Sequence, residues 1–205
     1  MENPEIQRLQ ASPRLQQQLQ FILEVDKLKT ILRQSRLIAN GRRENSAEHS
    51  WHLALMVMIL AEHANEPADL LHTMKLVIVH DIVEIDAGDT FAYDRDGALD
   101  KREREEQAAR RLFGILPADQ AAELHALWHE FEEQATPEAR LANAVDRLMP
   151  LMHNYFTRGG SWQQHGVTRP QVIDRVGAID DGSHELWDFA AHLIDQAVAE
   201  GILAP

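Results

Sequence analysis

Cysteine is absent from the 205-residue sequence, and this absence excludes several kinds of site. Disulfides, thiolate zinc sites and cysteine nucleophiles cannot form without it. Long apolar runs are also missing: the longest, residues 53–61, has nine residues, whereas a membrane span needs about 20. Residues 1–5 lack the basic and then apolar pattern of a secretory leader, so we predict a cytoplasmic location.

Basic side chains are few for a chain of this length. Lysine and arginine number 20 against 33 aspartates and glutamates, so the formal net charge is −13 with histidine counted as neutral. A nucleic-acid polymer or an anionic membrane would require a basic patch, and we expect neither as a partner. Hydrophobic residues at 44% and charged residues at 26% are typical of a globular protein. The sequence also has 11 histidines, and histidine together with carboxylate is a metal-binding combination.

Proline is missing from residues 14–66 and from residues 68–116, so two long stretches lack the strongest helix breaker. Apolar spacing and capping residues predict helices over residues 15–33, 45–64, 67–85, 99–113, 117–133, 137–156 with a kink at Pro150, a short segment after Thr168, and 183–200. Residues 88–94 read as a loop, and no segment alternates over the length of a strand. The predicted fold class is all-α. We expect one domain over residues 1–205, with the helices of about 168–200 packed on the rest.

The most informative segment is residues 76–85, where three ionisable side chains interrupt an apolar sequence: His80, Asp81 and Glu84. A helix that is apolar on nearly every face is buried, and a buried carboxylate is costly unless it is paired, hydrogen-bonded or metal-bound. His80 and Glu84 are four residues apart and so share a face. One metal ion could reach both His80 and Asp81. The alternative is a core histidine bonded to a backbone carbonyl and an aspartate bonded to arginine.

Two other predicted helices also carry an ionisable side chain among apolar residues. His49 lies near the start of the predicted helix at 45–64, and Asp146 interrupts residues 141–149. Taken alone, the position of His49 favours a structural or solvated histidine over a metal ligand, and the alternative for Asp146 is a salt bridge. Together with His80 and Asp81, they form the ordered pattern H…HD…D.

This order, carried by residues 42–50, 80–90 and 144–148, resembles the HD-domain metal-dependent phosphohydrolases, and within them the 5'-deoxynucleotidase branch. The resemblance covers residues 20–160. It implies a single-domain helical bundle of the HD-domain type. The implied activity is removal of phosphate from (deoxy)nucleoside 5'-monophosphates or similar small phosphomonoesters. Members of the family are commonly dimers, so a homodimer is an expectation of the same kind.

The resemblance also implies residue roles. His49, His80, Asp81 and Asp146 would be the metal ligands, Glu84 would be the catalytic acid or base, and Asp89 would orient the substrate. The implied cofactor is a divalent cation: Mn²⁺, Co²⁺, Fe²⁺, Zn²⁺ or Mg²⁺. Two nitrogen and two oxygen ligands suit the transition metals better than Ca²⁺.

Phosphate binding needs a cation besides the metal. In the family an arginine at the end of the first helix serves, and Arg33 is the best positional match, with Arg36 beside it. Both also read as solvated cations at a helix end. A tryptophan that often follows this arginine in the family, and takes part in preferring deoxyribose, is replaced here by Gln34. Sugar preference is therefore not carried over.

Two alternatives stay open. An HD hydrolase could act on nucleoside triphosphates, cyclic nucleotides or alarmones, but such larger anions would want more cations than the candidates Arg33, Arg36, Arg42 and Arg43. A non-catalytic metal-binding helical protein is the second alternative. Of the remaining histidines, we expect His125 and His129 on a solvated face, and His153 near the ligands without being one. The mixed-charge run 100–106 is expected to face solvent, with a place at the border of the pocket as the alternative, because it follows the loop that carries Asp89.

Overall fold

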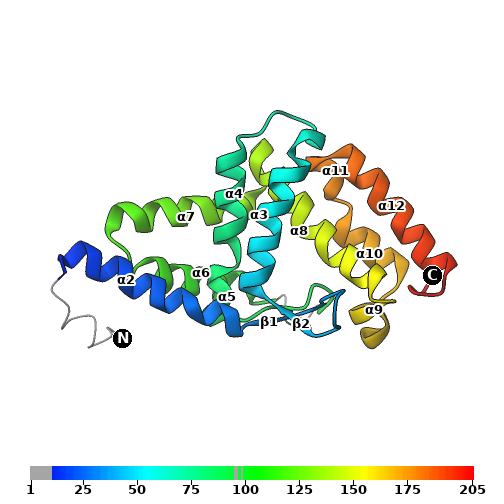
Figure 1. Ribbon diagram of the computed structural model, residues 1–205, viewed down its shortest axis with the longest axis horizontal. Coiled ribbons are helices and arrows are strands. Elements are labelled where there is room, and N and C mark those ends of the chain that lie inside the picture. Colours follow the sequence, from blue (N-terminus) through cyan, green and yellow to red (C-terminus); the bar gives the residue numbers. More distant parts are fainter. Residues whose placement is uncertain (1–10, 95–96, 98) are drawn as a thin grey trace.

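The computed structural model describes residues 11–94, 97 and 99–205, and Figure 1 shows the arrangement of its helices. Residues 1–5, on which the expectation of no leader depends, lie outside the described residues. In chain order the elements are α2 (Pro13–Val25), η1 (Asp26–Thr30), β1 (Leu32–Arg36), β2 (Arg43–Asn45), α3 (Ser46–Leu60), η2 (Ala61–His63), α4 (Leu70–Val79), η3 (His80–Val83), α5 (Glu84–Ala87), α6 (Lys101–Phe113), α7 (Ala118–Glu133), α8 (Pro137–Phe156), α9 (Gly160–His165), α10 (Arg169–Val176), α11 (Ile179–Gly182) and α12 (His184–Ala199), where η marks a 3-10 helix. The all-α prediction is confirmed, with one small exception at the β1–β2 pair.

The helix predicted over residues 15–33 is wrong at its C-terminal end. α2 stops at Val25, a 3-10 turn follows, and β1 pairs with β2 as an antiparallel hairpin. The spacing of Leu28 and Leu32 suggested one buried helix face, yet Leu28 is buried whereas Leu32 is 48% exposed. The strands are short and carry no apolar–polar alternation, so no local signal marks them. The guanidinium of Arg43 donates to the backbone carbonyl oxygens of Leu32 and Arg33, at 2.7 and 2.6 Å, and ties the two strands together.

The central helices begin where their capping residues predict. Asn45 caps α3, accepting from the backbone N–H of Glu48, whose carboxylate accepts from the N–H of Asn45 in return. Thr136 caps α8, and α8 continues through Pro150 without interruption. α8 packs against α3, α4, α7, α10, α11 and α12, and it runs through the middle of the molecule in Figure 1. The core therefore forms around this one helix.

The predicted helix over residues 67–85 is divided in the structure. Asp69, rather than Pro67, marks its start, because the Asp69 carboxylate accepts from the N–H of His72. At His80 the α-helix changes to the 3-10 turn η3, and α5 begins at Glu84. His80 and Asp81 thus lie on a tightened turn whose side chains are all buried, and Glu84 follows it at the start of α5.

The buried apolar side chains form one hydrophobic cluster, whose members range from Leu28 to Leu203 along the chain. The C-terminal elements pack on α8 through this cluster. α9 lies between two predicted helices, in a stretch for which no helix was predicted, and Ser183 caps α12 as expected. The single domain over the whole chain stays a prediction. Among the described residues, no helix is long and apolar enough to cross a membrane.

Candidate active site

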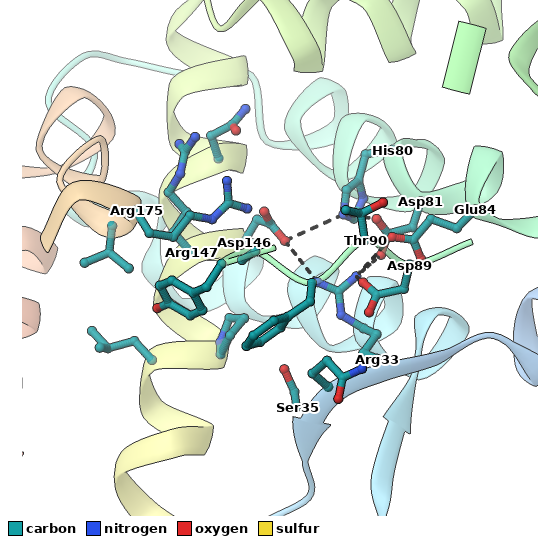
Figure 2. A pocket seen from close by; sticks show the side chains of 18 of the residues that line it. Arg33, Ser35, His80, Asp81, Glu84, Asp89, Thr90, Asp146, Arg147 and Arg175 are labelled. Atoms are coloured by element: carbon teal, nitrogen blue, oxygen red, sulfur yellow. Dashed lines mark hydrogen bonds and ion pairs between the residues drawn. The ribbon is translucent and has the colours of Figure 1, made fainter. Parts of the chain in front are cut away.

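A cavity of about 200 Å³ opens beside the β1–β2 hairpin and extends along α8. Its wall combines residues of β1, η3, α8 and α10 with the loop at residues 89–93, which forms no helix or strand, as predicted. Figure 2 shows these side chains converging from segments far apart in the sequence. Six of the predicted site residues line it directly: Arg33, His80, Asp81, Glu84, Asp89 and Asp146.

Histidine nitrogens and carboxylate oxygens meet at one end of this cavity. His80 Nε2 lies 2.9 Å from Asp81 Oδ1 and 3.7 Å from Asp146 Oδ1. His49 Nε2 lies 3.0 Å from Asp146 Oδ1 and 4.0 Å from Asp81 Oδ2. Three of these residues, His49, His80 and Asp81, offer ligand atoms that are all within 4.8 Å of one another. The structure thus brings the four predicted metal ligands together.

The orientation of both histidines suits metal binding. His80 Nδ1 is 2.8 Å from the carbonyl oxygen of Val77, which leaves Nε2 as the nitrogen that faces the carboxylates. His80 Nε2 is buried, and although Asp81 Oδ1 lies 2.9 Å away, it makes no hydrogen bond of good geometry with any described residue. His49 Nδ1 lies 3.4 Å from Glu44 Oε2, so its Nε2 also points into the cluster. A buried nitrogen without a partner beside two carboxylates fits a divalent cation.

Arg33 extends from β1 into the middle of the carboxylates, and Figure 2 shows its guanidinium between Asp81 and Asp146. Its Nη1 lies 2.6 Å from Asp81 Oδ2, 3.7 Å from Glu84 Oε1 and 4.0 Å from Asp89 Oδ1, and its Nη2 lies 4.0 Å from Asp146 Oδ1. Burial opposes its charge, but the carboxylates, Asp81 first, keep the pKa of Arg33 above its usual value. The arginine lies on a strand, not at a helix end as expected.

Glu84 and Asp89 lie on the same side of the cavity. Ser46 Oγ donates to Glu84 Oε2 at 2.6 Å, which holds this carboxylate at the start of α5. Burial, followed by the charge of Asp81, raises the pKa of Glu84 to about 8. Burial also raises the pKa of Asp89. A carboxyl group with a pKa near neutrality is suited to accept and release protons.

Some predicted residues are not brought to this cluster. Arg36 donates to the carbonyl oxygen of Gly41 at 3.0 Å and does not line the cavity. His153 is buried, but its Nδ1 lies 3.9 Å from Glu44, on the far side of His49 from the carboxylates. His125 and His129 belong to none of the possible metal-binding groups of the described residues.

The sequence interpretation missed several cavity residues. In the run 100–106 the alternative to a solvated face holds for two residues: Lys101 and Glu105 line the cavity 3.1 Å apart, because one face of α6 turns inward. Glu44 is 1% exposed and lies against His49. It belongs to the segment 42–50 that carries the family resemblance, but no role was predicted for it. Arg147 and Arg175 also line the cavity. Arg147 directly follows the predicted site residue Asp146, and this position in the sequence could have identified it as a cavity residue.

The charges predict how the stability of the metal-free protein varies with pH. Burial lowers the pKa of His80, but Asp81 and Asp146 outweigh it and raise that pKa well above its usual value; the pKa of Glu84 is raised to about 8. A group whose pKa is higher in the folded state takes up a proton on folding, so stability falls as pH rises through the folded pKa. Ionisation of Glu84 alone should lower the free energy of unfolding by roughly 2 kcal/mol between about pH 6 and about pH 8.

Thermal melting of EDTA-treated protein at the two pH values measures this effect, with a lower melting temperature expected at the higher pH. Glu84→Gln cannot ionise and should flatten the dependence. An unchanged or higher melting temperature at about pH 8 would contradict the expectation.

Comparisons with known proteins agree with this geometry. The chain is 32% identical to 5'-deoxynucleotidase HDDC2 of Bos taurus over 65% of this chain and 64% of the relative, and 31% identical to that of Homo sapiens over 65% of each chain. It therefore spans just under two thirds of the length of these curated relatives. A crystal structure from Magnetospirillum magnetotacticum MS-1, described as a predicted metal-dependent phosphohydrolase, is 54% identical with a TM-score of 0.90, over 94% of this chain and 96% of that one.

The profile of the HD domain matches residues 25–187, a range that contains His49, His80, Asp81 and Asp146. The match covers most of the chain, from the end of α2 into α12. The resemblance drawn from the H…HD…D order is confirmed, and this chain belongs to the HD domain family.

Proposed function

We propose that this chain is a metal-dependent phosphohydrolase that removes phosphate from (deoxy)nucleoside 5'-monophosphates or similar small phosphomonoesters. The observation that carries the proposal is the convergence, at one end of the cavity, of the buried nitrogens of His49 and His80, the carboxylates of Asp81 and Asp146, and the buried guanidinium of Arg33. The relatives named 5'-deoxynucleotidase and metal-dependent phosphohydrolase support it.

His49, His80, Asp81 and Asp146 would hold the metal. When bound there, a divalent cation supplies Lewis-acid chemistry at the phosphoryl group and makes water a stronger nucleophile near neutral pH. Burial disfavours the charge of Asp146, but His49 and His80 outweigh it and keep its pKa well below the usual range. Asp146 is therefore ionised at working pH, as a metal ligand must be.

The remaining groups handle the substrate and the proton. Arg33 would bind the phosphate oxygens, because its planar guanidinium offers paired donors and is already surrounded by the carboxylates that would hold the cation. Glu84, 3.7 Å from Arg33, would take the proton of the attacking water. Asp89, at the end of the loop, would position the substrate. Gln34 and Ser35 line the cavity where family members often carry a tryptophan, so sugar contacts there would be polar.

Phosphate release from a panel of small phosphomonoesters tests the proposal. Purified protein loaded with Mn²⁺ or Co²⁺ should release phosphate from at least one nucleoside 5'-monophosphate, and EDTA should abolish the release. Colorimetric phosphate detection is sufficient. If no monophosphate is hydrolysed with any of the metals, the monoesterase proposal is wrong; bound metal without turnover would then favour the non-catalytic alternative.

We also keep the homodimer as a proposal. Trp51, Met58 and Ile59 on α3 are 66%, 55% and 62% exposed, and such large apolar side chains could be covered by a second copy of the chain.

A further inference from the structure

The cavity has a second cationic region away from the candidate metal ligands. Arg147 on α8 and Arg175 on α10 both line it. In Figure 2 these two arginines lie on the opposite side of the view from His80, Asp81 and Glu84, with Asp146 and Arg33 between the two groups. A ligand whose phosphate is held at Arg33 could therefore extend toward Arg147 and Arg175.

Among the described residues, neither arginine is paired with a carboxylate. Within the part of the chain that the structure describes, no ion pair within 4 Å involves Arg147 or Arg175. Arg147 Nη1 donates only to the amide oxygen of Gln134, at 3.3 Å, and its Nε is buried with no partner. Three carboxylates, those of Asp146, Asp181 and Glu132, act on Arg147 from beyond ion-pair distance. Adjacent unpaired guanidinium groups gain stability when an anion binds between them.

These arginines also stand where two hollows meet. A second, more open hollow of about 340 Å³ shares Tyr93, Arg147 and Arg175 with the cavity of about 200 Å³. Gln171 and Asp174 of α10 line the outer part. The cavity of about 200 Å³ is lined both by the candidate metal ligands and by the two arginines, so one bound small molecule could contact both groups.

We propose that Arg147 and Arg175 form a second phosphate subsite, so that the preferred substrates are nucleoside bisphosphates, with one phosphate removed at the candidate metal site and the other held by the two arginines. Guanidinium forks match phosphate oxygens in paired hydrogen bonds, which makes phosphate a better occupant than a single carbonyl group. This inference rests on the proposed phosphohydrolase activity, because that activity places the first phosphate. Arg147 and Arg175 were not among the cations that the sequence analysis counted for a larger anion, and they add to that number.

Kinetics on two matched substrates test the subsite. With Mn²⁺-loaded protein, kcat/KM for adenosine 3',5'-bisphosphate should exceed that for adenosine 5'-monophosphate by about ten-fold or more, the effect of a charge-assisted hydrogen bond. Arg175→Gln should reduce this ratio toward one, since Arg175 is exposed and its loss should not disturb folding. Arg147→Gln should do the same. Arg169→Gln is the matched control: Arg169 lies on the same helix, pairs with Asp195 and lines neither hollow, so the ratio should be kept.

Calorimetric binding to the metal-free protein separates this inference from the proposed function. Adenosine 3',5'-bisphosphate should bind several-fold more weakly to Arg175→Gln than to Arg169→Gln. Hydrolysis of the monophosphate with no preference for the bisphosphate, and equal binding to both variants, would overturn the subsite and leave the proposed function standing. No hydrolysis of either nucleotide, with binding that depends on Arg175, would overturn the function and support the subsite.

Discussion

Replacing Asp81 by alanine is expected to remove most of the bound divalent cation and to lower phosphate release by more than about 100-fold. Mutation of a residue that only hydrogen-bonds to a metal ligand already lowers metal affinity or activity by about 10–100-fold. Asp81 is 6% exposed, and its two oxygens point to His80 at 2.9 Å and to His49 at 4.0 Å. Burial disfavours its charge, but His80 and Arg33 keep the pKa of Asp81 below the usual range. Asp81 is thus ionised and lies between two imidazoles, as a metal ligand would.

Metal content after dialysis, measured by mass spectrometry beside phosphate release, checks the prediction. Asp81→Ala also removes the 2.6 Å ion pair with Arg33, so Asp81→Asn, which keeps the shape of the side chain, guards against a folding defect. Asp86→Asn is the control, because Asp86 pairs with Arg111 and does not line the cavity. Full metal content in both Asp81 variants would refute the assignment of this ligand.

Glu84→Gln is expected to keep the metal and to lower kcat by about 10²–10⁴-fold, the usual contribution of a general base. Glu84 is 7% exposed, and its pKa, raised to about 8 by burial and by Asp81, suits proton transfer near neutral pH. The amide of glutamine can still accept the hydrogen bond that Ser46 donates at 2.6 Å, but it cannot take a proton from water. The variant therefore removes the base and preserves the local packing.

The measurement is single-substrate kinetics with metal content on the same sample. Glu24→Gln is a suitable control, since Glu24 is similarly buried at 9% exposed, pairs with Lys27 and Arg111, and lies outside the cavity. An active Glu84→Gln would move the base role to another group, with Asp89 the nearest candidate. Loss of metal from Glu84→Gln would instead indicate that Glu84 helps to hold the cation.

Helix starts were predictable where the capping side chain acts within its own turn. Asn45, Thr136 and Ser183 each accept from a backbone N–H three residues later, a contact that depends only on the local sequence. Asp69 carries the same capping signal, and the helix predicted from Pro67 therefore begins three residues before α4, which starts at Leu70. The β1–β2 hairpin carried no such local signal. Its pairing depends on contacts such as that of Arg43 with the backbone of Arg33.

Because the chain has no cysteine, histidine and carboxylate are its metal-binding side chains. Their order along the chain was enough to identify the family. Sequence alone determined the class of fold, the capped helices and the identity of the candidate ligands, because these depend on spacing and residue type. Only the tertiary structure decided how they meet: His49 and Asp146 are 97 residues apart and 3.0 Å from each other. It also placed Arg33 on a strand, left Arg36 outside, and brought Arg147 and Arg175 to the cavity. Such contacts arise from how α8, α10 and the hairpin pack, and no local pattern encodes that packing.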